Sequence, residues 1–183
     1  GALNLLGTVE KGNARSNTLV QSTQISSTSN GDITLGDIDG GYALTLANGS
    51  GTIDLQRVGA TTPLASLTLS GTGINVLRGG ITTVGAVDLL GTSRSTQLAS
   101  HVAITTTNSN VTGGALDGAT GTPQGTYDFV VSNGSGDILL GDVGSIIALG
   151  LNYADHVKEL SKELTITTKD EPLAFLKGPG SLV

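Results

Sequence analysis

His156 and Glu159 are the pair of residues in this chain whose types and spacing best suit acid–base chemistry. They are three positions apart in residues 153–164, where apolar residues recur at helical spacing. Residues i and i+3 share one face of a helix, so the Glu159 carboxylate can orient the His156 imidazole as a general base. Asp155, one residue earlier, can assist them. We therefore take His156, Glu159 and Asp155 as candidate catalytic residues, with a purely structural helix as the alternative.

The rest of the chain offers little further chemistry. His101, the other histidine, begins a predicted strand, where we expect it to be solvated. The absence of cysteine excludes disulfides, thiol catalysis and thiolate zinc ligands. Six aspartates fall near predicted corners but lack the strict spacing of calcium-binding solenoids: Asp32, Asp37, Asp39, Asp54, Asp137 and Asp142. We expect no cofactor, with a divalent metal as an option only if the chain is hydrolytic.

Charge and hydropathy limit the classes of partner. The net charge is −6 and the isoelectric point is near 4.6, which argues against nucleic acid and anionic membranes as partners. No run of 18 apolar residues exists, so we expect no membrane span. No basic and apolar leader is present, and Gly1 in a chain without Met suggests a trimmed start. We expect the chain as given to be soluble when expressed.

A short phrase that recurs in the chain predicts its architecture. Residues 48–55 (NGSGTIDL) return as residues 133–140 (NGSGDILL), and residues 30–35 (NGDITL) are an abbreviated copy. Asn and Gly tolerate the positive φ of a turn, and the apolar–polar–apolar triplet that follows suits a strand. Each copy is therefore a corner followed by a side, which predicts a β-solenoid.

The spacing of the aliphatic residues sets the expected size of one coil. They recur at intervals of 20 or 21 residues: Ile33 to Ile53, Ile53 to Ile74, Leu67 to Val87, and Ile81 to Val102. This period predicts a mostly β fold, a parallel β-helix of about seven coils with aliphatic ladders inside and Thr or Ser ladders outside. The spacing lapses over residues 105–125, where we expect a longer loop.

Three segments resemble the repeats of large secreted bacterial adhesins of the filamentous-haemagglutinin kind. They are residues 31–35 (GDITL), 61–69 (TTPLASLTL) and 79–83 (GGITT), and the likeness spans roughly residues 20–144. The resemblance implies a fragment of a right-handed parallel β-helix from a secreted or cell-surface protein. It implies no catalytic site.

The composition changes after Gly144. Four of the nine Lys and Arg residues lie in the last 39 positions, and all four are Lys, whereas the first 144 residues hold one Lys. Residues 145–150 and 172–177 read as strands, with the helix of residues 153–164 between them. We therefore predict a solenoid domain over 1–144 and a strand–helix–strand, βαβ-like appendage over 145–183.

This appendage resembles the opening of the catalytic domain of the fumarylacetoacetate hydrolase family. The likeness rests on residues 147–160 (IALGLNYADHVKEL) and 171–177 (EPLAFLK). It implies that His156 and Glu159 lie on a short helix over an active site and help to activate water. The family's acidic metal ligands come later in its sequence, after the point where this chain stops. The resemblance therefore transfers no metal site, and by inheritance alone the tail is inactive.

Two hypotheses about origin and function follow. Gly144-Ser145 and Gly180-Ser181 match a common in-frame cloning site, which suggests a fusion of two gene fragments, with chance as the alternative. The first functional hypothesis is a structural or adhesive solenoid. The alternative is a weak or promiscuous hydrolase of small esters or phosphoesters, with an active site near the C-terminal helix, either within one chain or at a subunit interface. We also expect a homo-oligomer formed through the C-terminal segment, since a solenoid end exposes sheet edges.

Overall fold

A computed structural model describes residues 1–5, 16–91, 94–118, 127–141, 146–150 and 173–177. The chain divides into two compact units, Gly1–Asp142 and Val143–Val183. No helix among the described residues is long and apolar enough to cross a membrane.

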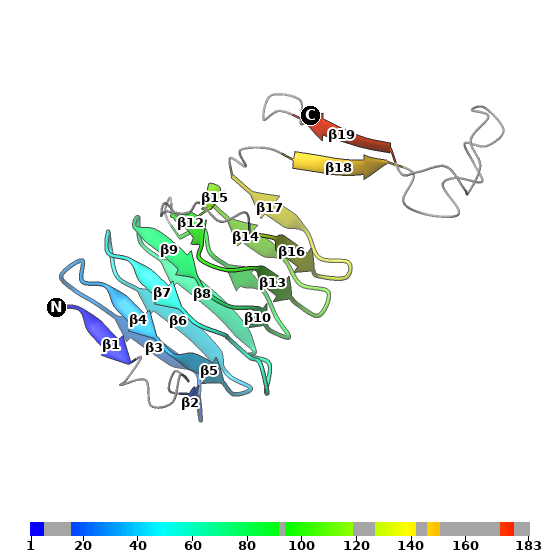
Figure 1. The fold of residues 1–183 in the computed structure, drawn as a ribbon. Coiled ribbons are helices and arrows are strands. Elements are labelled where there is room, and N and C mark those ends of the chain that lie inside the picture. The colour runs from blue at the N-terminus through cyan, green and yellow to red at the C-terminus, as the bar shows by residue number, and fades with distance from the viewer. Residues whose placement is uncertain (6–15, 92–93, 119–126, 142–145, 151–172, 178–183) are drawn as a thin grey trace, which may run out of the picture. The chain divides into compact units, whose positions relative to one another are not determined.

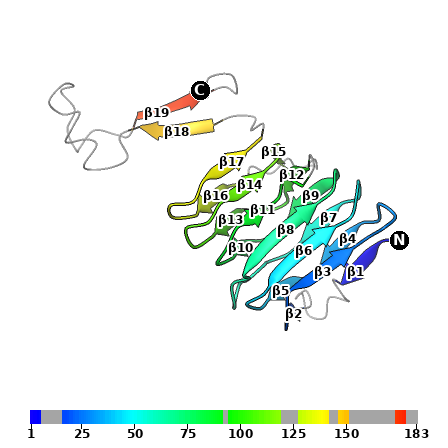
Figure 2. The same cartoon turned by 180° about the vertical axis from the view of Figure 1, so that it is seen from behind.

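The first unit is a parallel β-solenoid, as Figures 1 and 2 show from opposite sides. The first sheet contains β1 (Leu3–Leu5), β4 (Ile33–Leu35), β7 (Ile53–Leu55), β9 (Ile74–Leu77), β12 (Ser95–Leu98) and β15 (Leu116–Gly118). The second contains β3 (Thr23–Ser26), β6 (Ala43–Ala47), β8 (Ser66–Ser70), β11 (Val87–Asp88), β14 (Val111–Gly113) and β17 (Ile138–Leu140). The third side contains β2 (Ser16–Thr18), β5 (Asp37–Asp39), β10 (Ile81–Thr82), β13 (Val102–Thr105) and β16 (Phe129–Ser132), with isolated bridges through Val58 joining β5 to β10. The chain thus winds through about five turns.

Alternation along each strand separates the core from the surface. In β6 and β8, Leu44 pairs with Leu67 and Leu46 with Leu69, and all four leucines are fully buried. Thr45 pairs with Thr68 between them, and both are partly exposed. Since successive side chains of a strand point to opposite faces, stacking equal residues builds an aliphatic ladder inside and a threonine ladder outside. The predicted solenoid and its ladders are confirmed here.

The predicted register is wrong at two places. Ile53 pairs with Asn75, 22 residues later, and not with Ile74; Asn75 is buried and Ile74 is exposed. Ile81 pairs with Ile104, 23 residues later, and not with Val102. The coils therefore differ in length by a few residues, which the corners absorb while the strands keep their hydrogen bonds. Hydrophobicity alone selected Ile74 for the core, whereas polar contacts described below hold Asn75 there.

The predicted loop over residues 105–125 is also partly wrong. It contains β14 and β15, which continue the second and first sheets. Gly113 ends β14. Each of these strands has one aliphatic residue directed at the core, Val111 in β14 and Leu116 in β15, and Gly113 takes the second inward position of β14. The pair of aliphatic residues that marks the other strands is therefore missing, and hydrophobic spacing does not reveal them. Residues 119–126 of the predicted loop lie outside the described residues.

The second unit contributes two described strands. β18 (Ile146–Gly150) and β19 (Leu173–Lys177) lie in the two ranges where strands are predicted, and they pair antiparallel, with Ile146 opposite Lys177 and Gly150 opposite Leu173. A βαβ unit has parallel strands joined by a crossover, so the pairing differs from the predicted arrangement. An antiparallel pair needs no crossover on a sheet face and so forms without a larger sheet. The predicted helix of residues 153–164 lies outside the described residues.

Candidate functional site, a buried arginine at stacked glycine corners

The recurring Asn-Gly-Ser-Gly phrase forms the same corner in both copies. The Gly51 N–H donates to the Asn48 carbonyl at 3.3 Å, and the Gly136 N–H donates to the Asn133 carbonyl at 3.1 Å. Gly49 and Gly134 both have φ of 61°, in the left-handed region that favours glycine. The predicted corner-and-strand reading of the phrase is therefore confirmed, with glycine required at its second position.

The asparagine of each phrase turns its side chain inward and fastens the corner. Asn48 is fully buried, and its Nδ2 donates to the carbonyl of Thr52 at 3.0 Å and to that of Gly31 in the preceding coil at 3.4 Å. Asn133 repeats the pattern, with its Nδ2 donating to the carbonyls of Asp137 and of Ser109 in the preceding coil. One amide therefore closes its own turn and joins it to the coil beneath.

A second asparagine, from the preceding coil, supports each phrase from outside. Asn30 Oδ1 accepts a hydrogen bond from the Ser50 N–H at 3.3 Å, and Asn108 Oδ1 accepts one from the Ser135 N–H at 3.1 Å. Both asparagines have φ of 52°. Each corner is therefore built by an equivalent pair of asparagines, one buried and one exposed.

Arg94, which precedes β12, binds the first corner, and among the described residues no arginine binds the second. Its side chain is 1% exposed and reaches back across two coils. One terminal nitrogen donates to Asn48 Oδ1 at 2.9 Å, and Nε donates to Asn75 Oδ1. The other acceptors are backbone carbonyls, of Ile74 at 2.8 Å, Gly51 at 3.2 Å, and Ser70 and Gly49 at 3.4 Å.

Asn75 completes this internal cluster and explains the register of β9. Its Nδ2 donates to the Leu89 carbonyl at 2.8 Å and to Thr96 Oγ1 at 3.2 Å, while its Oδ1 accepts from Arg94. Asn75 and Thr96 occupy adjacent rungs of an inward column that holds Ile33 and Ile53 in earlier coils. This column thus changes from aliphatic to polar where Arg94 enters, while Leu77 and Leu98 keep the neighbouring inward column aliphatic.

The electrostatics of Arg94 are those of an isolated buried cation. No described carboxylate forms an ion pair with it, and burial lowers the pKa of its guanidinium. Its charge is instead stabilised by oxygen atoms of amides and carbonyls, and no buried side-chain N or O of the described residues lacks a partner. Since its donors are engaged and its surface is covered, Arg94 is equipped to hold coils together and not to bind a substrate.

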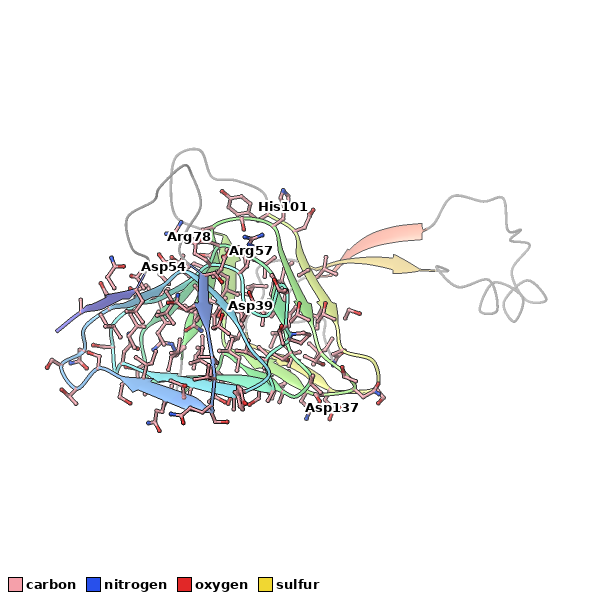
Figure 3. All side chains as sticks on the ribbon, turned by 90° about the horizontal axis from the view of Figure 1, so that it is seen from below. Asp39, Asp54, Arg57, Arg78, His101 and Asp137 are labelled. Carbon is pink, nitrogen blue, oxygen red and sulfur yellow. The ribbon has the colours of Figure 1, made fainter. Side chains whose placement is uncertain are left out.

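Charged side chains on the outer surface also join neighbouring coils. The Arg57 guanidinium donates two hydrogen bonds to Asp37 in the preceding coil, one through Nε at 3.1 Å and one through a terminal nitrogen. Arg78 donates to Asp54 in the same way, at 2.8 and 2.9 Å. These hydrogen bonds, before any other cause, raise the pKa of each arginine. Figure 3 shows Arg57, Arg78 and His101 on one side of the solenoid and Asp137 on the opposite side.

Three of the aspartates considered as weak calcium ligands, Asp32, Asp37 and Asp39, accept hydrogen bonds from backbone N–H groups. Asp32 Oδ1 accepts from the Thr52 N–H at 2.8 Å, and Asp39 Oδ1 accepts from the Thr61 and Thr62 N–H groups at 2.7 and 3.0 Å. Within the described part of the chain, no three His, Cys, Asp or Glu residues gather in a group that suits a metal ion. Asp32 and Asp39 instead accept from backbone N–H groups of the next coil, as Asn30 and Asn108 do through Oδ1.

His101 directly precedes β13 and is exposed, as expected, and it lies beside Asp128 and Tyr127. Its Nδ1 is 3.0 Å from the Asp128 backbone nitrogen and 3.1 Å from Asp128 Oδ2, and its ring meets that of Tyr127 edge to face at 5.9 Å. No nucleophilic side chain makes a described hydrogen bond with this imidazole. His101 therefore forms a surface contact between two coils.

The three predicted catalytic residues, His156, Glu159 and Asp155, lie outside the described residues. Their roles stay predictions. Sequence reasoning missed Arg94 and Asn75, which carry the internal cluster. The available signal was Arg94 itself, one of five Lys and Arg residues in the first 144 positions. The strand that follows it, β12, was not predicted.

Comparisons with protein-family models, with curated protein sequences and with solved structures found no match for this chain. The fold and the corner site therefore rest on the chain's own geometry. The resemblances to adhesin repeats and to the fumarylacetoacetate hydrolase family stay predictions.

Proposed function

We propose that this protein is a structural or adhesive β-solenoid module, wound right-handed like the secreted adhesin repeats that it resembles, with no chemistry of its own in the solenoid. The observation that carries the proposal is the use of polar side chains at the corners. Asn30, Asn48, Asp32 and Asp39 bond to backbone groups of their own or neighbouring coils. Such groups stabilise stacking and are not free to act on a substrate.

The threonine and serine ladders of the second sheet support the same function. The outward positions of β6 and β8 hold Ala43 beside Ser66, Thr45 beside Thr68 and Ala47 beside Ser70. Short uncharged side chains in register make an even surface whose form depends on the stack and not on a single residue. A repeated surface of this kind suits display or spacing, which need a shape and not a catalytic centre.

An adhesion assay tests the adhesive part of the proposal. Beads coated with the whole protein should stay on cultured cell layers under flow more strongly than beads coated with the Leu46→Asp variant. Leu46 is fully buried in the ladder, so an unpaired carboxylate there should unfold the coils. Equal retention of both bead types would overturn the adhesive role, because retention would not depend on the fold.

A hydrolysis assay tests the absence of chemistry against the hydrolase alternative. We expect turnover of activated esters and phosphoesters at the background rate, unchanged in His156→Ala, Glu159→Ala and Asp155→Ala. Turnover above background that His156→Ala abolishes, with the circular dichroism spectrum unchanged, would support the hydrolase instead. A divalent-metal chelator added to the active sample would then show whether that activity needs a metal ion.

A further inference from the structure

The structure places chemically identical dipeptides in different surroundings. The chain contains three Asn-Gly dipeptides, at residues 30–31, 48–49 and 133–134. In such a dipeptide the glycine backbone nitrogen lies one bond from the asparagine and can attack its side-chain carbonyl carbon, because glycine has no Cβ to crowd the approach. The surroundings of each dipeptide decide whether this reaction proceeds in the folded protein.

In two of the three dipeptides the asparagine side chain is buried and hydrogen-bonded, which protects it from this reaction. Asn48 is 0% exposed, its Nδ2 donates to two carbonyls, and its Oδ1 accepts from Arg94. Asn133 is 6% exposed, and its Nδ2 donates to the carbonyls of Gly136, Asp137 and Ser109. The amide nitrogen is the leaving group of the reaction, so these hydrogen bonds must break, and the corner must open, before either residue reacts.

Asn30 is different because it lies on the outside of its corner. It is exposed, its Oδ1 makes one long hydrogen bond, of 3.3 Å to the Ser50 nitrogen, and its Nδ2 donates to no described residue. The leaving group therefore faces water. We propose that Asn30-Gly31 is a site of spontaneous deamidation in the native protein, and that the asparagines of the other two dipeptides are protected.

The reaction balances without any added reagent except water. The Gly31 backbone nitrogen forms a bond to Asn30 Cγ and loses its proton to solvent, while the Cγ–Nδ2 bond breaks and ammonia leaves. Water then opens the resulting five-membered imide at one of its two carbonyls, which leaves aspartate or isoaspartate at position 30. Nothing is oxidised or reduced.

The product changes a corner on which the next coil rests. A Cβ on Gly49 would lie 2.1 Å from Asn30 Oδ1, and one on Gly51 would lie 2.6 Å from the Asn30 carbonyl oxygen, so the two coils are in close contact here. Isoaspartate adds a methylene to the main chain, and either product adds a negative charge beside Asp32. The modification should therefore weaken the stacking of the first full coil on the second.

Asn108 provides a matched control within the same chain. It shares with Asn30 an exposed position, φ of 52° and an Oδ1 that accepts from the next coil's serine N–H. Even the following backbone nitrogen is held alike, since Gly31 donates to Ser27 Oγ at 3.1 Å and Ser109 donates to Thr106 Oγ1 at 3.3 Å. The two sites differ in the residue that follows, which is Gly31 in one case and Ser109 in the other.

The test is a peptide map of the native full chain, incubated at mildly alkaline pH and analysed by mass spectrometry. We expect deamidation of Asn30 to exceed that of Asn48, Asn133 and Asn108 by about tenfold or more. Asn48 and Asn133 are buried and react only from an opened state, and Asn108 is followed by serine and not by glycine. In denaturant, Asn48 and Asn133 should rise to the rate of Asn30 while Asn108 stays slow.

Two variants complete the design. Ser109→Gly should raise deamidation at Asn108 toward the rate of Asn30, and Asn30→Gln should remove the modification of its peptide. Equal native rates at all three Asn-Gly dipeptides, or faster modification of Asn48 than of Asn30, would overturn the proposal. A native Asn30 no faster than Asn108 would do so as well, because glycine would then confer no reactivity at this corner.

Discussion

The Arg94 guanidinium donates a hydrogen bond of 2.9 Å to Asn48 Oδ1, across 46 residues of sequence and two coils of the solenoid. Neighbouring coils are joined by backbone hydrogen bonds between their strands, which form whatever the side chains are. The Arg94–Asn48 contact is instead specific to two side chains, and it spans the coil between them. It therefore fixes which corners stack, in a fold whose repeats are otherwise similar enough to slip.

Replacing Arg94 should cost stability although it removes a buried charge. In Arg94→Met the Oδ1 atoms of Asn48 and Asn75 lose their donor inside the protein, and each unsatisfied acceptor costs about 1–3 kcal/mol. Relief of the desolvated cation offsets part of this loss, so we expect a decrease of about 2 kcal/mol in the free energy of unfolding, measured by urea denaturation.

Arg78→Met is the matched control, since it removes an arginine whose ion pair with Asp54 is exposed. Its effect should stay below about 1 kcal/mol and shrink with added salt. If Arg94→Met were as stable as the parent, apolar packing would satisfy this corner equally well, and the role of Arg94 in fixing the stack would be lost.

Asn75 and Arg94 should be strongly coupled in a double-mutant cycle. Asn75→Leu restores the aliphatic column of Ile33 and Ile53 but leaves the Arg94 Nε without its acceptor. In an Arg94→Met background the same leucine leaves no donor without an acceptor, because the Arg94 Nε is absent. We therefore expect the double variant to be more stable than the sum of the single changes predicts, by about 1–2 kcal/mol. Additive effects would show that the two side chains do not act together.

The aliphatic strands were predictable from sequence because burial there depends on local alternation. Ile33, Ile53, Leu67 and Val87 alternate with polar residues and occupy the predicted rungs. The register failed at Asn75, where a polar side chain is buried because Arg94, 19 residues later, supplies its partner. A partner so distant leaves no periodic trace in the strand itself, so hydrophobic spacing selected Ile74 instead.

The corners were predictable for a different reason. The Asn-Gly-Ser-Gly phrase carries its own geometry, since Gly49 and Gly134 supply the positive φ and Asn48 and Asn133 close the turn. What the phrase does not encode is the coil beneath it. The supporting contacts of Asn30 and Asn108 depend on stacking 20 and 27 residues away, and these intervals become known only with the fold.

Glycine should be required at the second position of the Asn-Gly-Ser-Gly phrase, whereas alanine should be tolerated in place of Gly41 at another corner. Gly49→Ala and Gly134→Ala place a Cβ at φ of 61° and 2.1 Å from Oδ1 of Asn30 and Asn108, respectively. We expect each to lower the free energy of unfolding by about 1–3 kcal/mol, from backbone strain and displacement of that asparagine. Gly41→Ala, whose Cβ would meet nothing within 4 Å, should change it by less than about 0.5 kcal/mol. Equal effects at all three positions, in thermal or urea unfolding, would contradict the assigned corner geometry.

Self-association should occur at the C-terminal end of the solenoid. The last described coil exposes three large apolar side chains, Val130 at 55%, Ile138 at 50% and Leu139 at 62%, whereas Val111, which pairs with Ile138 one coil earlier, is fully buried. Strands at the end of a stack also carry unpaired backbone groups, which favour pairing with a second copy. We expect sedimentation velocity to show a larger species whose fraction rises with concentration and falls in Ile138→Lys. Val84→Lys places the same charge at an exposed valine of a middle coil and should leave association unchanged. A monomer at all concentrations, or equal loss in both variants, would show that this end does not bind a second copy.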